Sequence, residues 1–212
     1  TLWGQEQETA AGMVFIDPFG IFFSLIILII SFLTLLSSIS FAEREGIAFG
    51  EYYALILLST TGMMIMVQTR HLLMIFVGLE LLSIPLYVLA GMTRSRVKSL
   101  ESSLKYFLLG AFSTGFIIYG IALIYGATGS LTLVGISMHS GNSAIFFIGM
   151  ALVIIGFSFK IAAFPFHFWA PDVYTGSPTP VAGFLSTASK AAGFAVILRL
   201  FMTVFEGADI TI

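Results

Sequence analysis

Six long apolar stretches, separated by short segments that hold most of the charged residues, constrain the fold of this chain more than any other feature. Only 9% of the residues are Asp, Glu, Lys or Arg, whereas a soluble domain averages roughly 25%. A straight membrane-spanning helix needs about 20 predominantly apolar residues. The pattern therefore predicts an all-α integral membrane protein with about six spans. Their expected ranges are about 18–41, 51–70, 71–92, 103–125, 143–174 and 180–205.

The stretch from 143 to 174 is longer than one straight span requires. Pro165 and Pro171 remove backbone donors within it, so a continuous helix is disfavoured there. We expect a broken helix, with a first half ending near Phe164 and a short second half ending near Tyr174. Broken helices in membranes are tolerated where the freed backbone groups line a polar cavity, and they mark transport sites.

The basic residues of the chain suggest its orientation in the membrane. Asp17 and Pro18 are typical of a helix start, with a capping residue followed by proline at the first helical position. The basic cluster at 94–98 marks the cytoplasmic side of the membrane. Three predicted spans separate this cluster from residues 1–17, so residues 1–17 are predicted to lie on the opposite, extracytoplasmic side. Residues 18–212 are predicted to form a transmembrane domain. Because Thr1 is not an initiator Met, we expect a fragment or a processed piece.

Three ionisable residues, Glu80, Lys160 and Lys190, lie near the middle of predicted spans. A charged side chain at the bilayer centre costs at least ~2.5–3.5 kcal/mol, so such residues usually serve ion movement. We interpret them as groups that carry protons. For Glu80 the alternative is a structural ion pair, and its leucine neighbours require any partner to come from another segment. For the lysines the alternative is snorkelling to the interface, which suits Lys105 near a helix end better than the central Lys190.

His167 follows Lys160 across the predicted break, and the residues alone do not decide between a proton relay and a hydrogen-bonded core histidine. The acidic and histidine residues show no metal-ligand spacing, and no glycine-rich phosphate loop is present. The chain contains no cysteine, so iron–sulfur ligation by Cys is excluded. Any redox chemistry is expected to take place in another chain.

Four spaced motifs resemble one family, the antiporter-like membrane subunits of respiratory complex I. Within that family the motifs are similar to those of subunit N, which is called subunit 2 in organelles. The motifs lie at Gly78–Leu86, Ser99–Tyr106, Gly156–Tyr174 and Gly176–Lys190.

The resemblance implies a fold of two inverted five-helix repeats, each with one broken helix. This chain would hold the first repeat, at about 50–206. It implies proton translocation in which the acid matching Glu80 pairs with the lysine matching Lys160. Lys190 would continue the central polar axis, and Lys105 and His167 would belong to the supporting network.

The same resemblance implies that this chain holds no cofactor, and that NADH, FMN, iron–sulfur clusters and quinone bind to other subunits. Its expected partners are the M-type and K-type membrane subunits and the lipid bilayer, with no nucleic acid. A bacterial inner membrane is the expected location, rather than an organellar one. A cation/proton antiporter subunit of the Mrp type is the alternative function, and a scaffold whose charges merely pair is a third reading.

Overall fold

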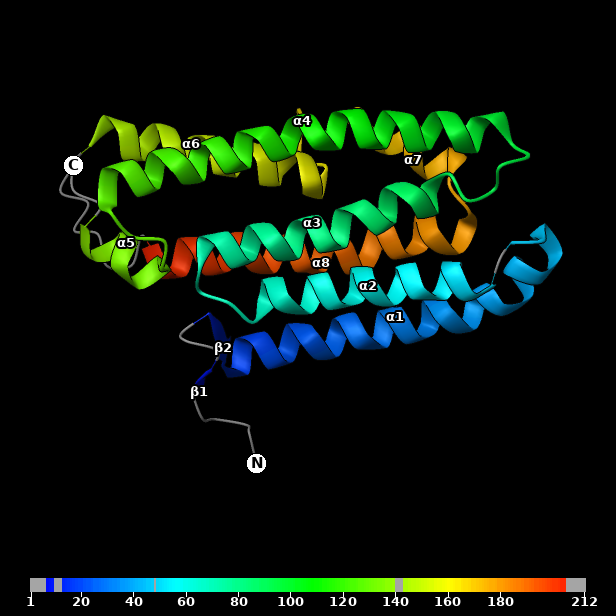
Figure 1. Cartoon of the computed structure of the whole chain (residues 1–212), viewed down its shortest axis with the longest axis horizontal. Coiled ribbons are helices and arrows are strands. Elements are labelled where there is room, and N and C mark those ends of the chain that lie inside the picture. The colour runs from blue at the N-terminus through cyan, green and yellow to red at the C-terminus, as the bar shows by residue number, and fades with distance from the viewer. Residues whose placement is uncertain (1–6, 10–12, 48, 140–142, 205–212) are drawn as a thin grey trace.

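The computed structural model describes residues 7–9, 13–47, 49–139 and 143–204. Long helices run side by side along the longest axis of the molecule (Figure 1). Within these residues six helices are long and apolar enough to cross a membrane, which confirms the predicted all-α membrane architecture. The helices are α1 Pro18–Glu45, α2 Phe49–Val67, α3 Leu72–Ala90, α4 Val97–Thr128, α5 Leu133–His139, α6 Ala144–Ile161, α7 Ala170–Gly176 and α8 Thr179–Val204.

The N-terminal part contains two short strands, β1 Gln7–Thr9 and β2 Val14–Ile16, which pair antiparallel. Helix α1 then begins where the sequence predicts. The side chain of Asp17 accepts a hydrogen bond of 2.7 Å from the backbone N–H of Gly20, and Pro18 occupies the first turn. The capping interaction satisfies one of the backbone donors that the first helical turn leaves free.

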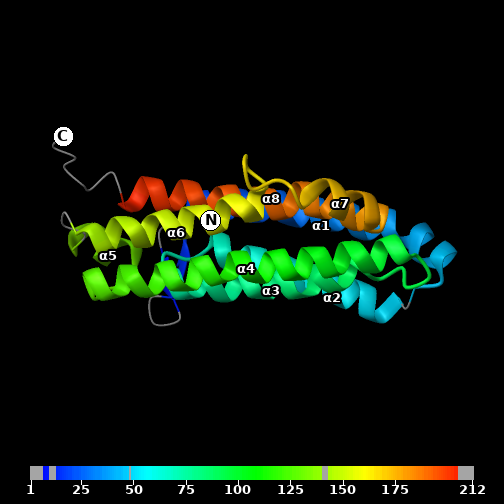
Figure 2. The ribbon, with the colours of Figure 1, turned by 90° about the horizontal axis from the view of Figure 1, so that it is seen from above.

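The helices form two layers, which are visible in the view turned by 90° (Figure 2). Helices α2, α3 and α4 lie in one layer, and α6, α7 and α8 lie in the other. Helix α1 packs against α2 and α8, and α4 packs closely against α6. Gly120 and Gly149 face each other in the α4–α6 contact, where an added Cβ on either would lie within 3.0 Å of the other's carbonyl oxygen. Small residues of this kind let membrane helices approach closely. Helix α3 is the most buried of the six spans, so its polar side chains are shielded by neighbouring helices.

The predicted break between 143 and 174 is confirmed. Helix α6 ends at Ile161, and Ala162 has the left-handed conformation, with φ of 59°, that terminates many helices. Helix α7 begins at Ala170 and runs only to Gly176. The connecting residues lie between the two helix ends, beside α8 (Figure 2).

Candidate functional site

Three polar side chains follow one another along a single face of α3. Glu80, Ser83 and Tyr87 are separated by three and four positions, and residues at that spacing are neighbours on a helix surface. Ser83 and Tyr87 are buried and Glu80 is half-buried. This face receives contacts from α4 and α6, which bring the remaining polar groups of the site.

Glu80 receives a hydrogen bond from α4. The hydroxyl of Thr114 donates to Glu80 Oε1 at 2.9 Å. The sequence requires a partner from another segment, and in the structure this partner is a neutral hydroxyl. Among the described residues, no basic side chain forms an ion pair with Glu80.

Lys160 lies in the last turn of α6 and points its amine at α3. Its Nζ donates to Ser83 Oγ at 3.1 Å and to the hydroxyl of Tyr87 at 3.0 Å. The lysine therefore contacts the same face of α3 that carries Glu80, one turn farther along the helix. The structure places the predicted acid and lysine in one cluster, but each is bound by neutral hydroxyl groups in place of the other.

Lys190, in the middle of α8, lies at the broken end of α6. Its Nζ donates to the carbonyl oxygen of Lys160 at 2.6 Å and lies 4.6 Å from the centre of the Trp169 ring. A carbonyl at a helix C-terminus carries partial negative charge and favours a cation. The two lysines are therefore joined through the backbone of Lys160.

Aromatic rings support both lysines. Tyr87 packs edge-on against Tyr106 at 4.7 Å between ring centres, and Tyr106 stacks on Trp169 at 4.9 Å. The indole N–H of Trp169 donates to the carbonyl oxygen of Phe159 at 2.9 Å. The rings thus connect α3, α4 and the break in one buried layer, and they fix the groups that Lys160 and Lys190 contact.

The two supporting residues of the sequence prediction lie apart from this cluster. Lys105 forms ion pairs of 2.7 Å with Glu101 and 2.6 Å with Asp172. These pairs join the N-terminal part of α4 to the first turn of α7, beside a cavity of about 250 Å³. His167 is exposed, with its ring centre 5.7 Å from that of Phe164. In the described part of the chain its ring forms no hydrogen bond with either central lysine, so its role stays a prediction.

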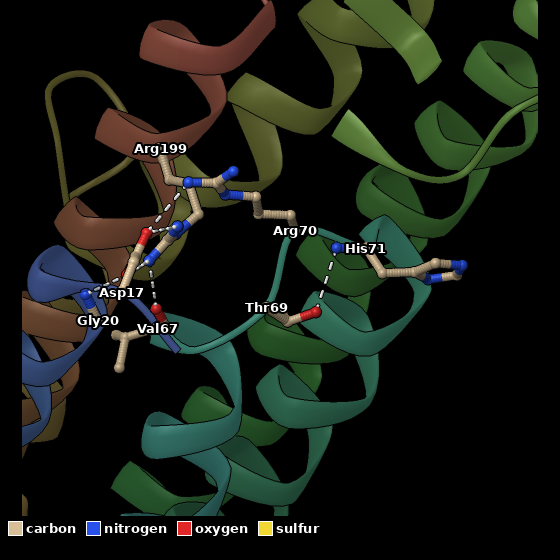
Figure 3. Close-up of polar contacts among 7 residues, drawn as sticks. All are labelled: Asp17, Gly20, Val67, Thr69, Arg70, His71 and Arg199. Atoms are coloured by element: carbon tan, nitrogen blue, oxygen red, sulfur yellow. Dashed lines mark hydrogen bonds and ion pairs between the residues drawn. The ribbon is translucent and has the colours of Figure 1, made fainter. Parts of the chain in front are cut away.

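Sequence reasoning missed a buried charge cluster at one end of α1, α2 and α8 (Figure 3). Arg199 forms two hydrogen bonds with the Asp17 carboxylate, of 2.7 and 2.9 Å, and a third of 2.8 Å with the carbonyl oxygen of Val67. Arg70 reaches the same carboxylate at 3.3 Å. In the sequence, Arg199 stands out only as a basic residue near the end of the last span, which indicates an orientation and no partner.

The cluster affects the titration of Asp17, which lies just outside the first span. Burial of the carboxyl group raises its pKa, but the hydrogen bonds from Arg199 and Gly20 and the nearby charge of Arg70 outweigh this. The pKa of Asp17 is therefore lowered from its ordinary value of 3.8. The ionised form is the one that holds the cluster together.

Among the described residues, no group of three or more histidine, aspartate or glutamate side chains gathers as metal ligands would. The central cluster instead combines one carboxylate, two amines and hydroxyl groups, which are suited to exchanging protons and hydrogen bonds.

Residues 69–212 match a family model described as NADH:quinone oxidoreductase/Mrp antiporter, transmembrane. The chain belongs to this family. Subunit N of the NADH-quinone oxidoreductase of Trichlorobacter lovleyi is 49% identical over 210 residues, which cover 97% of the chain and 43% of that relative. The resemblance to subunit N drawn from the four motifs is confirmed, and this family member spans less than half the length of such relatives.

Two solved structures share this arrangement of helices. A chain of respiratory complex I from Thermus thermophilus with bound aureothin is 44% identical, with a TM-score of 0.81, and 93% of this chain covers 43% of it. A chain of the Mrp complex from a Dietzia species is 27% identical, with a TM-score of 0.76, and 95% of this chain covers 39% of it. Of these two, the complex I chain is the more similar in sequence and in fold.

Proposed function

We propose that this chain is part of a proton-translocating membrane subunit of an NADH:quinone oxidoreductase. One observation carries the proposal: the Lys160 amine lies inside a bundle of membrane helices, on the face of α3 that also carries Glu80. The proton affinity of an amine in a low-dielectric site depends on whether a carboxylate or a neutral group faces it. Exchange between these two neighbours would let Lys160 bind and release a proton.

The energy required is of the size that such an exchange can supply. Moving one proton against a membrane potential of 100 mV takes about 2.3 kcal/mol. Breaking or forming a hydrogen bond to a charged group changes the free energy by about 1.5–3 kcal/mol. Lys190, which contacts the backbone of Lys160, is the next group along the proposed path.

Several finer assignments belong to the same proposal. Electron transfer would take place in other subunits, which would bind NADH, FMN, iron–sulfur clusters and quinone, while this chain would bind none of them. Neighbouring M-type and K-type membrane subunits would couple that electron transfer to proton movement in this chain. The location would be the bacterial inner membrane, with residues 1–17 on the extracytoplasmic side. The similarity to the subunit N relative supports the assignment to an NADH:quinone oxidoreductase, and the basic cluster at 94–98 supports the orientation.

The test is proton pumping by the assembled complex after Lys160→Ala. We expect pumping to fall by at least about tenfold, which corresponds to ~1.4 kcal/mol on the limiting barrier, while the complex still assembles. Lys98→Ala, at an exposed lysine of α4, is the matched control and should pump like the parent. If Lys160→Ala pumps protons at the rate of the parent, the proposed role of Lys160 is wrong.

The Mrp-type alternative rests on the similarity to the Dietzia chain. It predicts sodium-dependent pH changes in vesicles that contain the protein without an electron-transfer arm. Pumping that requires quinone reduction and is unaffected by sodium would favour the proposed function.

A further inference from the structure

The hydroxyl of Thr114 has two acceptors within reach. Its Oγ1 lies 2.9 Å from Glu80 Oε1 and 3.1 Å from the carbonyl oxygen of Gly110. A hydroxyl group has a single hydrogen to donate and can accept through its lone pairs. Thr114 can therefore donate to an ionised Glu80, or donate to Gly110 and accept a hydrogen bond from a protonated Glu80. The same side chain suits both protonation states of the acid.

Thr128 shows what is particular to Thr114. It lies on the same helix, and its hydroxyl also donates back to the carbonyl four residues earlier, that of Ile124, at 2.8 Å. Its second acceptor is another carbonyl, that of Ser130 at 3.3 Å. The bond from Thr114 to a carboxylate is therefore not required by the helix itself.

The position of Lys160 gives this bond a consequence. The hydroxyls of Ser83 and Tyr87 on α3 hold the amine, while the hydroxyl on α4 holds the carboxylate of Glu80. The two groups whose pairing the proposed function requires are thus each occupied by a neutral partner. The structure represents the separated arrangement of the pair.

We propose that Thr114, on α4, is a positioning residue that holds the carboxylate of Glu80 away from Lys160 and so sets when Glu80 can pair with Lys160. This inference rests on the proposed function. When the lysine ammonium gives a proton to Glu80, one N–H bond breaks and one O–H bond forms. The hydroxyl of Thr114 then turns to Gly110 and accepts the new Glu80 O–H, so no further reactant is needed.

The experiment compares Thr114→Val, Thr114→Ser and Thr128→Val in the assembled complex. Valine keeps the shape of threonine without the hydroxyl, and serine keeps the hydroxyl. We expect Thr114→Val to slow proton pumping by about tenfold, the size expected for losing one hydrogen bond to a charged group. Thr114→Ser should restore most of the rate, and Thr128→Val, the matched control, should pump like the parent.

An infrared measurement separates positioning from loss of structure. The carboxyl band of Glu80 is identified as the band that Glu80→Gln removes. We expect this band to shift in Thr114→Val and to stay in place in Thr128→Val. Parental pumping by Thr114→Val, or slow pumping with an unshifted band, overturns the role of Thr114. Parental pumping by Glu80→Gln would instead overturn the proposed function.

Discussion

At the scale of single residues, the site depends on space beside the hydroxyl of Tyr87. Gly110 of α4 lies against this ring, and a Cβ added there would overlap the hydroxyl oxygen. The same hydroxyl is an acceptor for the Lys160 amine. A methyl group at position 110 would therefore displace the Tyr87 hydroxyl, which is a direct contact of the Lys160 amine.

Gly110→Ala is expected to slow proton pumping severalfold and to lower the thermal stability of the protein, because the buried tyrosine ring must move in a closely packed region. Gly115→Ala is the matched control on the same helix, since its Cβ would meet nothing within 4 Å. Alanine also favours helix over glycine by about 1 kcal/mol, so this control should be neutral or stabilising. Pumping assays and thermal unfolding of both variants test the prediction, and equal behaviour of the two would contradict it.

At the scale of helices, the sequence predicts what depends on local chemistry. The apolar stretches, the cap at Asp17 and the prolines at 165 and 171 predict the spans, the start of α1 and the break, because each acts on the backbone of its own segment. Helix α5 is not expected from the sequence, because it is a short helix of 7 residues inside a segment that is predicted to connect two spans. Helix α4 begins before the expected range because its first residues, 97–102, mix two apolar side chains with Lys98, Glu101 and two serines, which weakens the hydropathy signal there.

The same distinction explains the site. Glu80, Lys160 and Lys190 stand out as charges inside apolar stretches. Their hydroxyl partners do not, since serine, threonine and tyrosine are common in membrane helices and gain meaning only when packing brings them to a charge. The separation of Glu80 from Lys160 by neutral partners is likewise a property of the three-dimensional arrangement.

At the scale of the whole molecule, the Asp17 cluster joins parts of the chain that are far apart in sequence. Asp17 and Arg199 are separated by 182 positions, which no local pattern can reveal. Both side chains are almost fully buried, at 6% and 4% exposure. The cluster fixes the start of α1 to the last part of α8 and to the end of α2.

Asp17→Asn is expected to destabilise the protein by about 3–5 kcal/mol, because the charge of Arg199 is left buried without compensation. The lowered pKa of Asp17 gives this effect a pH dependence. The contribution of the ionised carboxylate is complete above its ordinary pKa of 3.8 and is lost as the pH falls through the lower pKa of the folded state.

Thermal unfolding in detergent at neutral pH and at pH values well below 3.8 measures this effect. The difference in stability between the parent and Asp17→Asn should shrink in acid. A difference that is the same at every pH would show that the carboxylate charge does not hold the cluster.

The central claim is that Glu80 and Lys160 act as one unit, and a double-mutant cycle on proton pumping tests it most directly. Glu80→Gln, Lys160→Met and the double variant would be compared in the assembled complex, with quinone reduction followed in parallel. We expect each single variant to lose most of its pumping and the double variant to pump no less than the poorer single one. Losses that simply multiply in the double variant would mean that the two residues act independently, which contradicts the account.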